Sequence, residues 1–500
     1  MRVLFSDGLH LNNKNFSSLL EYLNQVDAVI TRPNFNNDSI CRFGDYSQWP
    51  SIVRLAEELV TLSADELISI NSNGVNLFDT CLAELMSKCA TKDHWINALD
   101  YKKSKKELFD ALFLSDKDDL LLNIASAKYW VQYWFNFLSS KTFDFVFVFS
   151  GSLTYSASLI EVMKGFQGRV FLFESFFTGR HYYCEEKYSH LPNNSDSRFK
   201  TQLTSRTAPG AVIDQMRLER GIKEALNAKN KNVSQPTPQQ KSIFNNGKRT
   251  VLIGGQVLND FSLLKTNETG IHSISVYKSI IEKILSETEL NVIFKAHPWE
   301  NRKNNLLEPK TKNIICEYFH ASSRFAVVEN YALSDLFSEV DYVVVINSQL
   351  GIEAALQGFK PIQVGNAFYG GYGFTYDINN LDAIVELIHG DANGLLSIDE
   401  YTLLREYLMH MLIDYLVPED CVTGIPKLKQ IFNISPAKKL TQQTKAINKD
   451  SSINNIEKPA QHINSKKLVA NKKLAKLKRN PRKFLLDSRF FLLRYLGRAI

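Results

Sequence analysis

Short apolar runs that alternate with helical patterns are the feature that most constrains this chain. In the first half, residues 143–149 (FDFVFVF) and 169–175 (RVFLFES) are two unbroken apolar runs on either side of a helical pattern. An uninterrupted apolar strand is buried on both faces, which is typical of a parallel sheet covered by helices. Residues 1–6 (MRVLFS) predict a further strand, and residues 16–23 predict a helix with one apolar face.

The same alternation resumes in the second half of the chain. Strands with helices between them are expected at residues 250–255, 291–297, 324–330, 341–347 and 360–365. Residues 228–248 are polar, contain two prolines and have no periodicity, so they predict a linker. We therefore expect an α/β fold of two Rossmann-like domains facing a cleft, an outline called glycosyltransferase-B-like. Other two-domain α/β proteins share this outline, so it does not settle the function.

The expected domain organisation follows from these patterns. Residues 1–230 are predicted to form the first domain and residues 231–249 the linker. Residues 250–432 are predicted to form the second domain, and residues 433–500 a basic, flexible tail with amphipathic helices.

The net charge of +6 divides unevenly along the 500 residues. Residues 436–500 contain 17 Lys and Arg against three acidic residues, so they carry +14 and the remainder carries −8. The sequence pI is therefore a poor guide to partners, and no motif for nucleic-acid binding accompanies the charge. The tail mixes basic clusters with Leu and Phe, and such amphipathic helices bind anionic membranes. A solvated tail, or a helix docked on its own domain, is the alternative.

Six separated cysteines without a CxxC pair favour a reducing compartment over a disulfide scaffold or a zinc module. The N-terminus has no apolar region of signal-peptide length, and no run reaches the ~20 apolar residues that span a bilayer. These features predict a cytoplasmic protein.

Candidate site residues follow the ends of predicted strands, where open α/β sheets bind ligands. In the second half, Asp260 follows a glycine-supported turn and can act as an acid, a base or a nucleophile, or can cap the next helix. Lys295 and His297 end the next strand and suit a phosphate oxygen, although a strand-end histidine can also be satisfied by the backbone.

A further strand runs directly into a helix at Ser348. Its hydroxyl and the first helical amides, expected to be free, predict an anion site. Glu353 lies further along the helix, where it can reach a ribose diol or pair locally. In the first half, Glu174 ends a strand and is expected to face Asp260 across the cleft, as the two carboxylates of glycosyl transfer do.

Other acidic residues are interpreted as structural. Asp116 precedes a helical pattern and is expected to cap it. Glu185 and Glu186 are expected to be solvated. No cluster with metal-ligand spacing is apparent, so no metal site is predicted.

Taken together and in this order, the second-half motifs resemble the capsule polysaccharide biosynthesis family, including bacterial β-Kdo glycosyltransferases, where Kdo is 3-deoxy-octulosonic acid. The resemblance rests on Gly255-Gln256-Val257 with Asp260 and Ser262, Lys295-x-His297-Pro298, Ser334-Asp335-Leu336-Phe337, Ser348-x-x-Gly351-x-Glu353-Ala354, Gly358-x-x-Pro361 and the aromatic–glycine string 368–375. It is strong over residues 250–377. Before them it rests mainly on Phe173-Glu174 and Gly179-Arg180.

The resemblance implies a metal-independent enzyme without a cofactor that uses CMP-Kdo and retains the anomeric configuration by double displacement. By this likeness, the first domain is the acceptor side and the second domain binds the nucleotide sugar. Asp260 is then the nucleophile and Glu174 the general acid/base at the acceptor. The expected nucleotide-sugar site comprises Gln256, Lys295, His297, Ser348, Gln349, Glu353 and Tyr369. Lys295, His297 and Ser348 would hold the CMP phosphate, and Glu353 the ribose.

The implied partners are a CMP-activated ulosonic acid donor and a glycan or glycolipid acceptor of capsule or lipopolysaccharide. The tail also looks like those of bacterial transferases that work at the inner membrane face, which implies peripheral association with that membrane. Two alternatives stay open: a transferase using another CMP- or UDP-activated sugar, and a noncatalytic glycan-assembly subunit that keeps the fold.

Overall fold

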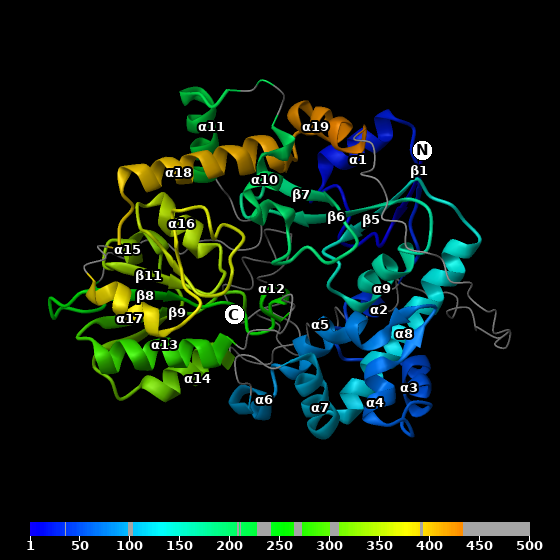
Figure 1. Cartoon of the computed structure of the whole chain (residues 1–500), viewed down its shortest axis with the longest axis horizontal. Helices are drawn as coiled ribbons and strands as arrows, with labels where there is room; N and C mark the ends of the chain where they lie inside the picture. The colour runs from blue at the N-terminus through cyan, green and yellow to red at the C-terminus, as the bar shows by residue number, and fades with distance from the viewer. Residues whose placement is uncertain are drawn as a thin grey trace, which may run out of the picture. The chain divides into compact units, whose positions relative to one another are not determined.

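Two six-stranded sheets form the framework of the protein in this computed structural model (Figure 1). The structure describes residues 1–35, 37–98, 104–207, 210, 212–227, 242–264, 273–300, 310–390 and 394–433. Both sheets belong to one compact unit, Met1–Lys438.

The first sheet has the strand order β14-β7-β6-β5-β1-β2. Its strands are β1 (Arg2–Phe5), β2 (Val29–Thr31), β5 (Phe145–Phe149), β6 (Arg169–Ser175), β7 (His181–Glu186) and β14 (Val417–Pro418). The strands β2, β1, β5 and β6 pair in parallel, whereas β7 and β14 are antiparallel additions at one edge. Alternate residues face opposite cores: Phe147 and Phe171 pack with α1 (Ser17–Gln25) and α19 (Cys421–Asn433). Val146 and Val170 pack in the core that contains α5 (Leu77–Cys89), α8 (Lys117–Ser139) and α9 (Thr154–Met163).

The second sheet is parallel throughout, with the order β10-β9-β8-β11-β12-β13. Its strands are β8 (Thr250–Gly254), β9 (Asn291–Lys295), β10 (Phe325–Val328), β11 (Tyr342–Val345), β12 (Ile362–Gln363) and β13 (Tyr376–Asp377). Counted along the chain, this is the 3-2-1-4-5-6 order of a Rossmann sheet. The order reverses between β8 and β11, which is where such sheets bind nucleotides.

Helices cover both faces of the second sheet (Figure 1). The helices α13 (Ser273–Glu287), α14 (Lys310–Phe319) and α17 (Asp382–His389) pack against one set of alternating strand residues. The helices α15 (Leu333–Phe337) and α16 (Leu350–Leu356) pack against the other set. Both sheets are helix-covered, the second is parallel throughout and the first is parallel from β2 to β6, which confirms the expected α/β class with two Rossmann-like domains.

The remaining elements complete the fold. They are α2 (Asn37–Ile40), α3 (Pro50–Glu57), α4 (Ala64–Ser69), the hairpin β3 (Asn71–Ser72) and β4 (Val75–Asn76), α6 (Asp93–Ala98), α7 (Lys105–Ser115), α10 (Lys200–Leu203), α11 (Gln215–Leu226), α12 (Phe261–Leu264), α18 (Ile398–Met409), the 3₁₀ turns η1 (Asp196–Arg198) and η2 (Thr204–Arg206), and the π-helix η4 (His410–Tyr415).

The last described segment returns to the first sheet rather than staying with the second. Residues 417–432 were expected in the domain 250–432, yet β14 pairs with β7 and α19 packs against α1. The ring of Phe432 lies 4.9 Å from that of Phe171 and 5.5 Å from that of Phe147. Burial of this aromatic side chain therefore completes the core of the first domain. The strand and helix pattern of the sequence did not indicate this return to the first domain.

The expectation that Glu185 is solvated is wrong. Glu185 lies on β7 with no solvent exposure. Its carboxylate accepts hydrogen bonds from the Tyr415 hydroxyl at 2.8 Å and the Lys187 ammonium at 3.2 Å. These partners satisfy the buried charge. Glu186, next along the strand, is exposed and pairs with Arg169 at 2.6 Å.

Two predicted segments fall largely outside the described residues. Of the expected linker 231–249, the structure describes 242–249, and of the expected tail 433–500 it describes only Asn433. Within the described part of the chain, no helix is both long enough and apolar enough to cross a bilayer.

Candidate functional site

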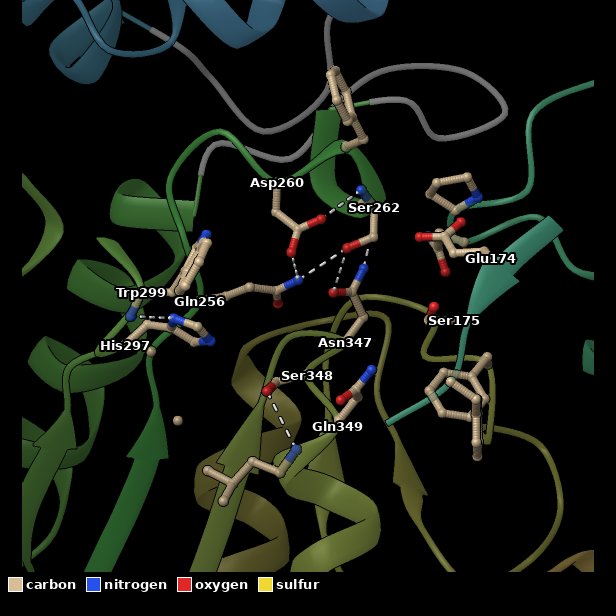
Figure 2. Close-up of a pocket in the computed structure, with 18 of the residues that line it drawn as sticks. Glu174, Ser175, Gln256, Asp260, Ser262, His297, Trp299, Asn347, Ser348 and Gln349 are labelled. Carbon is tan, nitrogen blue, oxygen red and sulfur yellow. Dashed lines mark hydrogen bonds between the residues drawn. The ribbon is translucent and has the colours of Figure 1, made fainter. Parts of the chain in front are cut away.

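A pocket of about 580 Å³ lies where strand ends of both sheets converge (Figure 2). The first domain contributes His10, Phe149, Ser150, Glu174, Ser175 and Tyr183. The second contributes Gln256, Asp260, Ser262, Lys295, His297, Trp299, Asn347, Ser348, Gln349, Glu353 and Phe368. The pocket thus brings together every residue predicted for the site except Tyr369.

Asp260 lines this pocket at the end of the loop that follows β8. Gly255 begins the loop, and a side chain there would meet the backbone oxygen of Lys295 at 2.7 Å, so only glycine fits. One carboxylate oxygen of Asp260 accepts from the Ser262 amide at 2.9 Å and caps α12. The other lies 3.3 Å from Gln256 Nε2. Asp260 therefore combines the capping role with a place in the pocket (Figure 2).

Glu174 lies near the end of β6, on the first-domain side of the pocket (Figure 2). Its Oε2 atom is buried without a hydrogen-bond partner among the described residues. Burial raises the pKa of Glu174 to about 8, with further contributions from the negative charges of Asp260 and Glu185. A carboxyl group with this pKa exchanges protons near neutral pH, as a general acid/base must.

Lys295 and Glu353 are a second pair of titratable groups in the pocket wall. The Lys295 ammonium donates to the backbone oxygen of Glu329 at 2.8 Å, and burial lowers its pKa although the charges of Glu329 and Glu353 oppose the shift. Burial also raises the pKa of Glu353 to about 7, against the charge of Lys295. Lys295 ends β9, and Glu353 lies in the first turn of α16, the helix that follows β11. Both therefore stand at the carboxyl edge of the Rossmann sheet, where a nucleotide would sit.

His297 follows β9 and its ring orientation is fixed by the backbone. Its Nδ1 atom accepts a hydrogen bond from the Trp299 amide at 3.1 Å (Figure 2). In the neutral ring this bond places the proton on Nε2, so that nitrogen can donate to a phosphate oxygen. The sequence left open whether His297 binds a ligand or is satisfied by the backbone. The structure shows both a backbone hydrogen bond and a position in the pocket wall.

Ser348 begins the turn into α16. The first amides of this helix were expected to be free, but they are hydrogen-bonded. The Leu350 amide donates to the Ser348 hydroxyl at 3.3 Å, and the Gly351 amide donates to the Ser348 carbonyl at 3.1 Å. The local turn thus satisfies these donors itself. The Ser348 hydroxyl and the Gln349 side chain still line the pocket and can contact a ligand.

Tyr369 does not line the pocket, in contrast to the expectation. It is fully buried, and its hydroxyl donates to the Ser348 carbonyl at 2.5 Å. A side chain at Gly351 would collide with this hydroxyl, so Tyr369 packs directly behind the turn. The neighbouring Phe368 reaches the pocket instead and packs edge-on against Phe176 of the first domain, with the ring centroids 5.6 Å apart.

Asn347 and Ser262 are pocket residues that the site prediction left out. The Asn347 amide donates to the Ser262 carbonyl at 3.0 Å, and the Ser262 hydroxyl lies 3.4 Å from Asn347 Oδ1. This pair connects the segment after β11 to the first turn of α12, the helix that Asp260 caps (Figure 2). Both residues lie at or after the end of a predicted strand, and this position was the sequence signal that could have identified them.

Asp116 was expected to cap α8, but its side chain makes no capping hydrogen bond. Its carboxylate is buried and accepts from His94 Nε2 at 2.8 Å and from Lys92 and Trp95. Cys89, Asp116 and Asp119 offer ligand atoms within 4.8 Å of one another, outside the pocket. Since Lys92 bonds both carboxylates, the cluster is an ion-pair network, and we assign it no metal.

Comparison with known proteins places the second half in a family context. Residues 213–394 match the sequence model of the family described as capsule polysaccharide biosynthesis protein. The lipopolysaccharide-processing protein LpsZ of Rhizobium meliloti is 28% identical over 174 residues, which cover 34% of this chain and 37% of LpsZ. The chain thus spans little more than a third of this curated relative. The family resemblance predicted from the motifs is confirmed over the matched segment.

Solved structures show looser likenesses. The beta Kdo 2,4 transferase of Thermosulfurimonas dismutans KpsC is 17% identical and covers 54% of this chain and 79% of its own, with a TM-score of 0.36. The beta Kdo 2,7 transferase of the same protein is 19% identical, with coverages of 59% and 88% and a TM-score of 0.35. The glycosyltransferase SnogD of Streptomyces nogalater is 12% identical, with coverages of 86% and 100% and a TM-score of 0.30. The fold described above rests on the strand orders of the two sheets.

Proposed function

We propose that this protein transfers Kdo from CMP-Kdo to a hydroxyl group of a capsule or lipopolysaccharide acceptor, with retention of configuration. The observation that carries this proposal is the meeting of Asp260 and Glu174 in one pocket. The two carboxyl groups come from different domains, and the negative charge of Asp260 contributes to the raised pKa of Glu174. Two carboxyl groups on opposite sides of a sugar are the machinery of glycosyl transfer.

The proposed reaction has two displacement steps. The Asp260 oxygen that is not used in capping attacks the anomeric carbon of Kdo, and the bond from that carbon to the CMP phosphate oxygen breaks. CMP leaves with the bonding electrons. The acceptor oxygen then attacks the same carbon, its proton passes to Glu174, and the Asp260 carboxylate is released. Two inversions at one carbon give overall retention.

The donor site proposed on the second sheet follows from the residues around the switch point. Lys295 can neutralise the CMP phosphate, and His297 and Ser348 can donate hydrogen bonds to it. Glu353 can accept from the ribose hydroxyls, and Gln256 and Gln349 add neutral hydrogen-bonding groups. Because protein cations and a monophosphate leaving group can share the developing charge, we propose that transfer proceeds without a metal ion.

A donor screen tests this proposal. The full-length protein is incubated with CMP-Kdo, another CMP-nonulosonate and UDP-sugars, with and without EDTA, and nucleotide release is measured. We expect CMP release from CMP-Kdo alone, at a rate that EDTA leaves unchanged. Release from a UDP-sugar instead would contradict the donor assignment. A protein that cleaves none of the donors with any surface-glycan acceptor would support the noncatalytic alternative.

We propose that the basic tail keeps the enzyme beside the cytoplasmic face of the inner membrane. Residues 436–500 carry +14, and each cation near an anionic surface contributes about 1 kcal/mol. Removing them should abolish co-sedimentation with anionic vesicles and leave CMP binding unchanged. Vesicles of neutral lipid are the control. Equal sedimentation of the shortened and full-length proteins would refute the assignment.

A further inference from the structure

A third polar cluster reaches the pocket from the end of β1, and the proposed reaction does not use it. Asp7 is 1% exposed and accepts four hydrogen bonds. The donors are the Ser6 hydroxyl at 2.9 Å, the Tyr155 hydroxyl at 2.8 Å, the His10 amide at 2.7 Å and His10 Nδ1 at 3.1 Å. The carboxylate is therefore fixed on several sides, and it fixes the imidazole of His10 in turn.

The His10 ring is held on its face as well as at its edge. It stacks on Phe149, with ring centroids 4.6 Å apart and an interplanar angle of 8°. Phe149 is the last residue of β5 and pairs in register with Phe173, which immediately precedes Glu174 on β6. His10 and Glu174 thus stand at the same edge of the first sheet, and both line the pocket. The side chain of His10 is 23% exposed.

The contacts of His10 keep its ring protonated. Burial by itself would lower the pKa of the imidazole, but the hydrogen bonds to Asp7 and Cys41, and the charge of Asp7, outweigh burial and raise the pKa to about 9. At neutral pH both ring nitrogens therefore carry protons. Nδ1–H donates to Asp7. The Cys41 side chain also interacts with the ring, and because a thiol is a weak acceptor, an oxyanion can take its place.

We propose that His10 is a substrate-binding residue whose imidazolium donates a hydrogen bond to an anionic oxygen group, a carboxylate or phosphate, of the substrate. This inference rests on the proposed function in one respect: it takes the substrates to be sugar acids or phosphorylated glycans. Because Asp7 balances the charge of His10, recognition is local and directional rather than a long-range attraction. The position beside Glu174, on the first sheet, favours an acid group of the acceptor over the donor carboxylate.

Kinetics with matched acceptors test this assignment. The acceptor is offered with its carboxylate and as the carbinol that lacks the charge. We expect His10→Gln to raise KM for the charged acceptor about 10- to 100-fold and to leave KM for the carbinol within about twofold. His320→Gln, which removes an exposed histidine outside the pocket, is the control. A raised KM for CMP-Kdo instead would assign the same contact to the donor carboxylate.

Two outcomes would overturn the inference. One is a His10→Gln variant with wild-type KM values for both substrates. The other is a lower kcat at unchanged KM, because a proton-transfer role would change the chemical step and not binding.

A second measurement does not depend on catalysis. The ring resonances of His10, assigned by comparison with His10→Gln, are followed while free Kdo, its methyl ester or inorganic phosphate is added to the full-length protein. Saturable shifts with an anion and none with the ester are expected, even if the donor screen finds no activity. The absence of a shift with both anions would refute anion binding at His10 and leave the proposed function untouched.

Discussion

Replacing Asp260 by Asn is expected to lower Kdo transfer at least about 1,000-fold, because a neutral amide cannot form the glycosyl ester. The substitution is nearly isosteric, and the Asn side-chain oxygen can still accept the hydrogen bond from the Ser262 amide and so cap α12. The variant should therefore fold normally and bind CMP like the wild type. Initial rates of transfer and calorimetric titration with CMP measure the two properties separately.

Asp214 provides a matched control for this substitution. It caps α11 in the same way, with its Oδ1 accepting from the Arg217 amide at 2.8 Å, and it does not line the pocket. Asp214→Asn should leave the transfer rate unchanged. If Asp260→Asn keeps more than about a tenth of the wild-type rate, Asp260 serves only as a helix cap and the proposed nucleophile is wrong.

Replacing Glu174 by Gln is expected to lower transfer to the acceptor by about 100- to 10,000-fold, the usual contribution of a positioned acid/base. The effect should depend on pH. Glu174 must be ionised to accept the acceptor proton, and its pKa is raised to about 8 by burial and by the charges of Asp260 and Glu185. The wild-type rate at low acceptor concentration should therefore rise with pH and level off above about 8, and this step should be absent in the variant.

Thermal unfolding supplies the control for Glu174. A buried carboxyl group with a raised pKa costs stability as pH rises above its unfolded value of 4.5, and the cost grows until pH passes about 8. Glu174→Gln should thus be at least as stable as the wild type at pH 8, which separates lost chemistry from lost folding. Glu186→Gln, on the neighbouring strand and outside the pocket, should retain the wild-type pH profile. A wild-type rate that is flat between pH 6 and 9 would contradict the role of Glu174.

Much of the framework was predictable because parallel strands buried on both faces are apolar without interruption. The strands β5, β6, β8, β9 and β11 lie within the segments expected for them. The antiparallel strand β7 was missed because its sequence, HYYCEE, ends in two glutamates. Glu185 is tolerated inside through Tyr415 and Lys187, and Tyr415 is 230 positions away in the chain. Because the partner that stabilises this buried charge is far away in the chain, the sequence around Glu185 does not indicate that it is buried.

The site was predictable where a polar residue follows a strand. This rule placed Asp260, Lys295, His297 and Glu174 in one pocket. Applied to the first strand, it would also have found His10, which follows β1 after a short turn. The rule fails for Tyr369, because which of two adjacent aromatic residues faces the pocket depends on how the loop packs behind Ser348.

The most direct test of the account is the intact mass of Glu174→Gln after incubation with CMP-Kdo. With the acceptor step blocked, the covalent intermediate should accumulate. We expect a mass increase of one Kdo residue, located on Asp260 by peptide mapping and absent when Asp260→Asn is added. Release of CMP from an unmodified protein, or an adduct on another residue, would contradict the double-displacement mechanism.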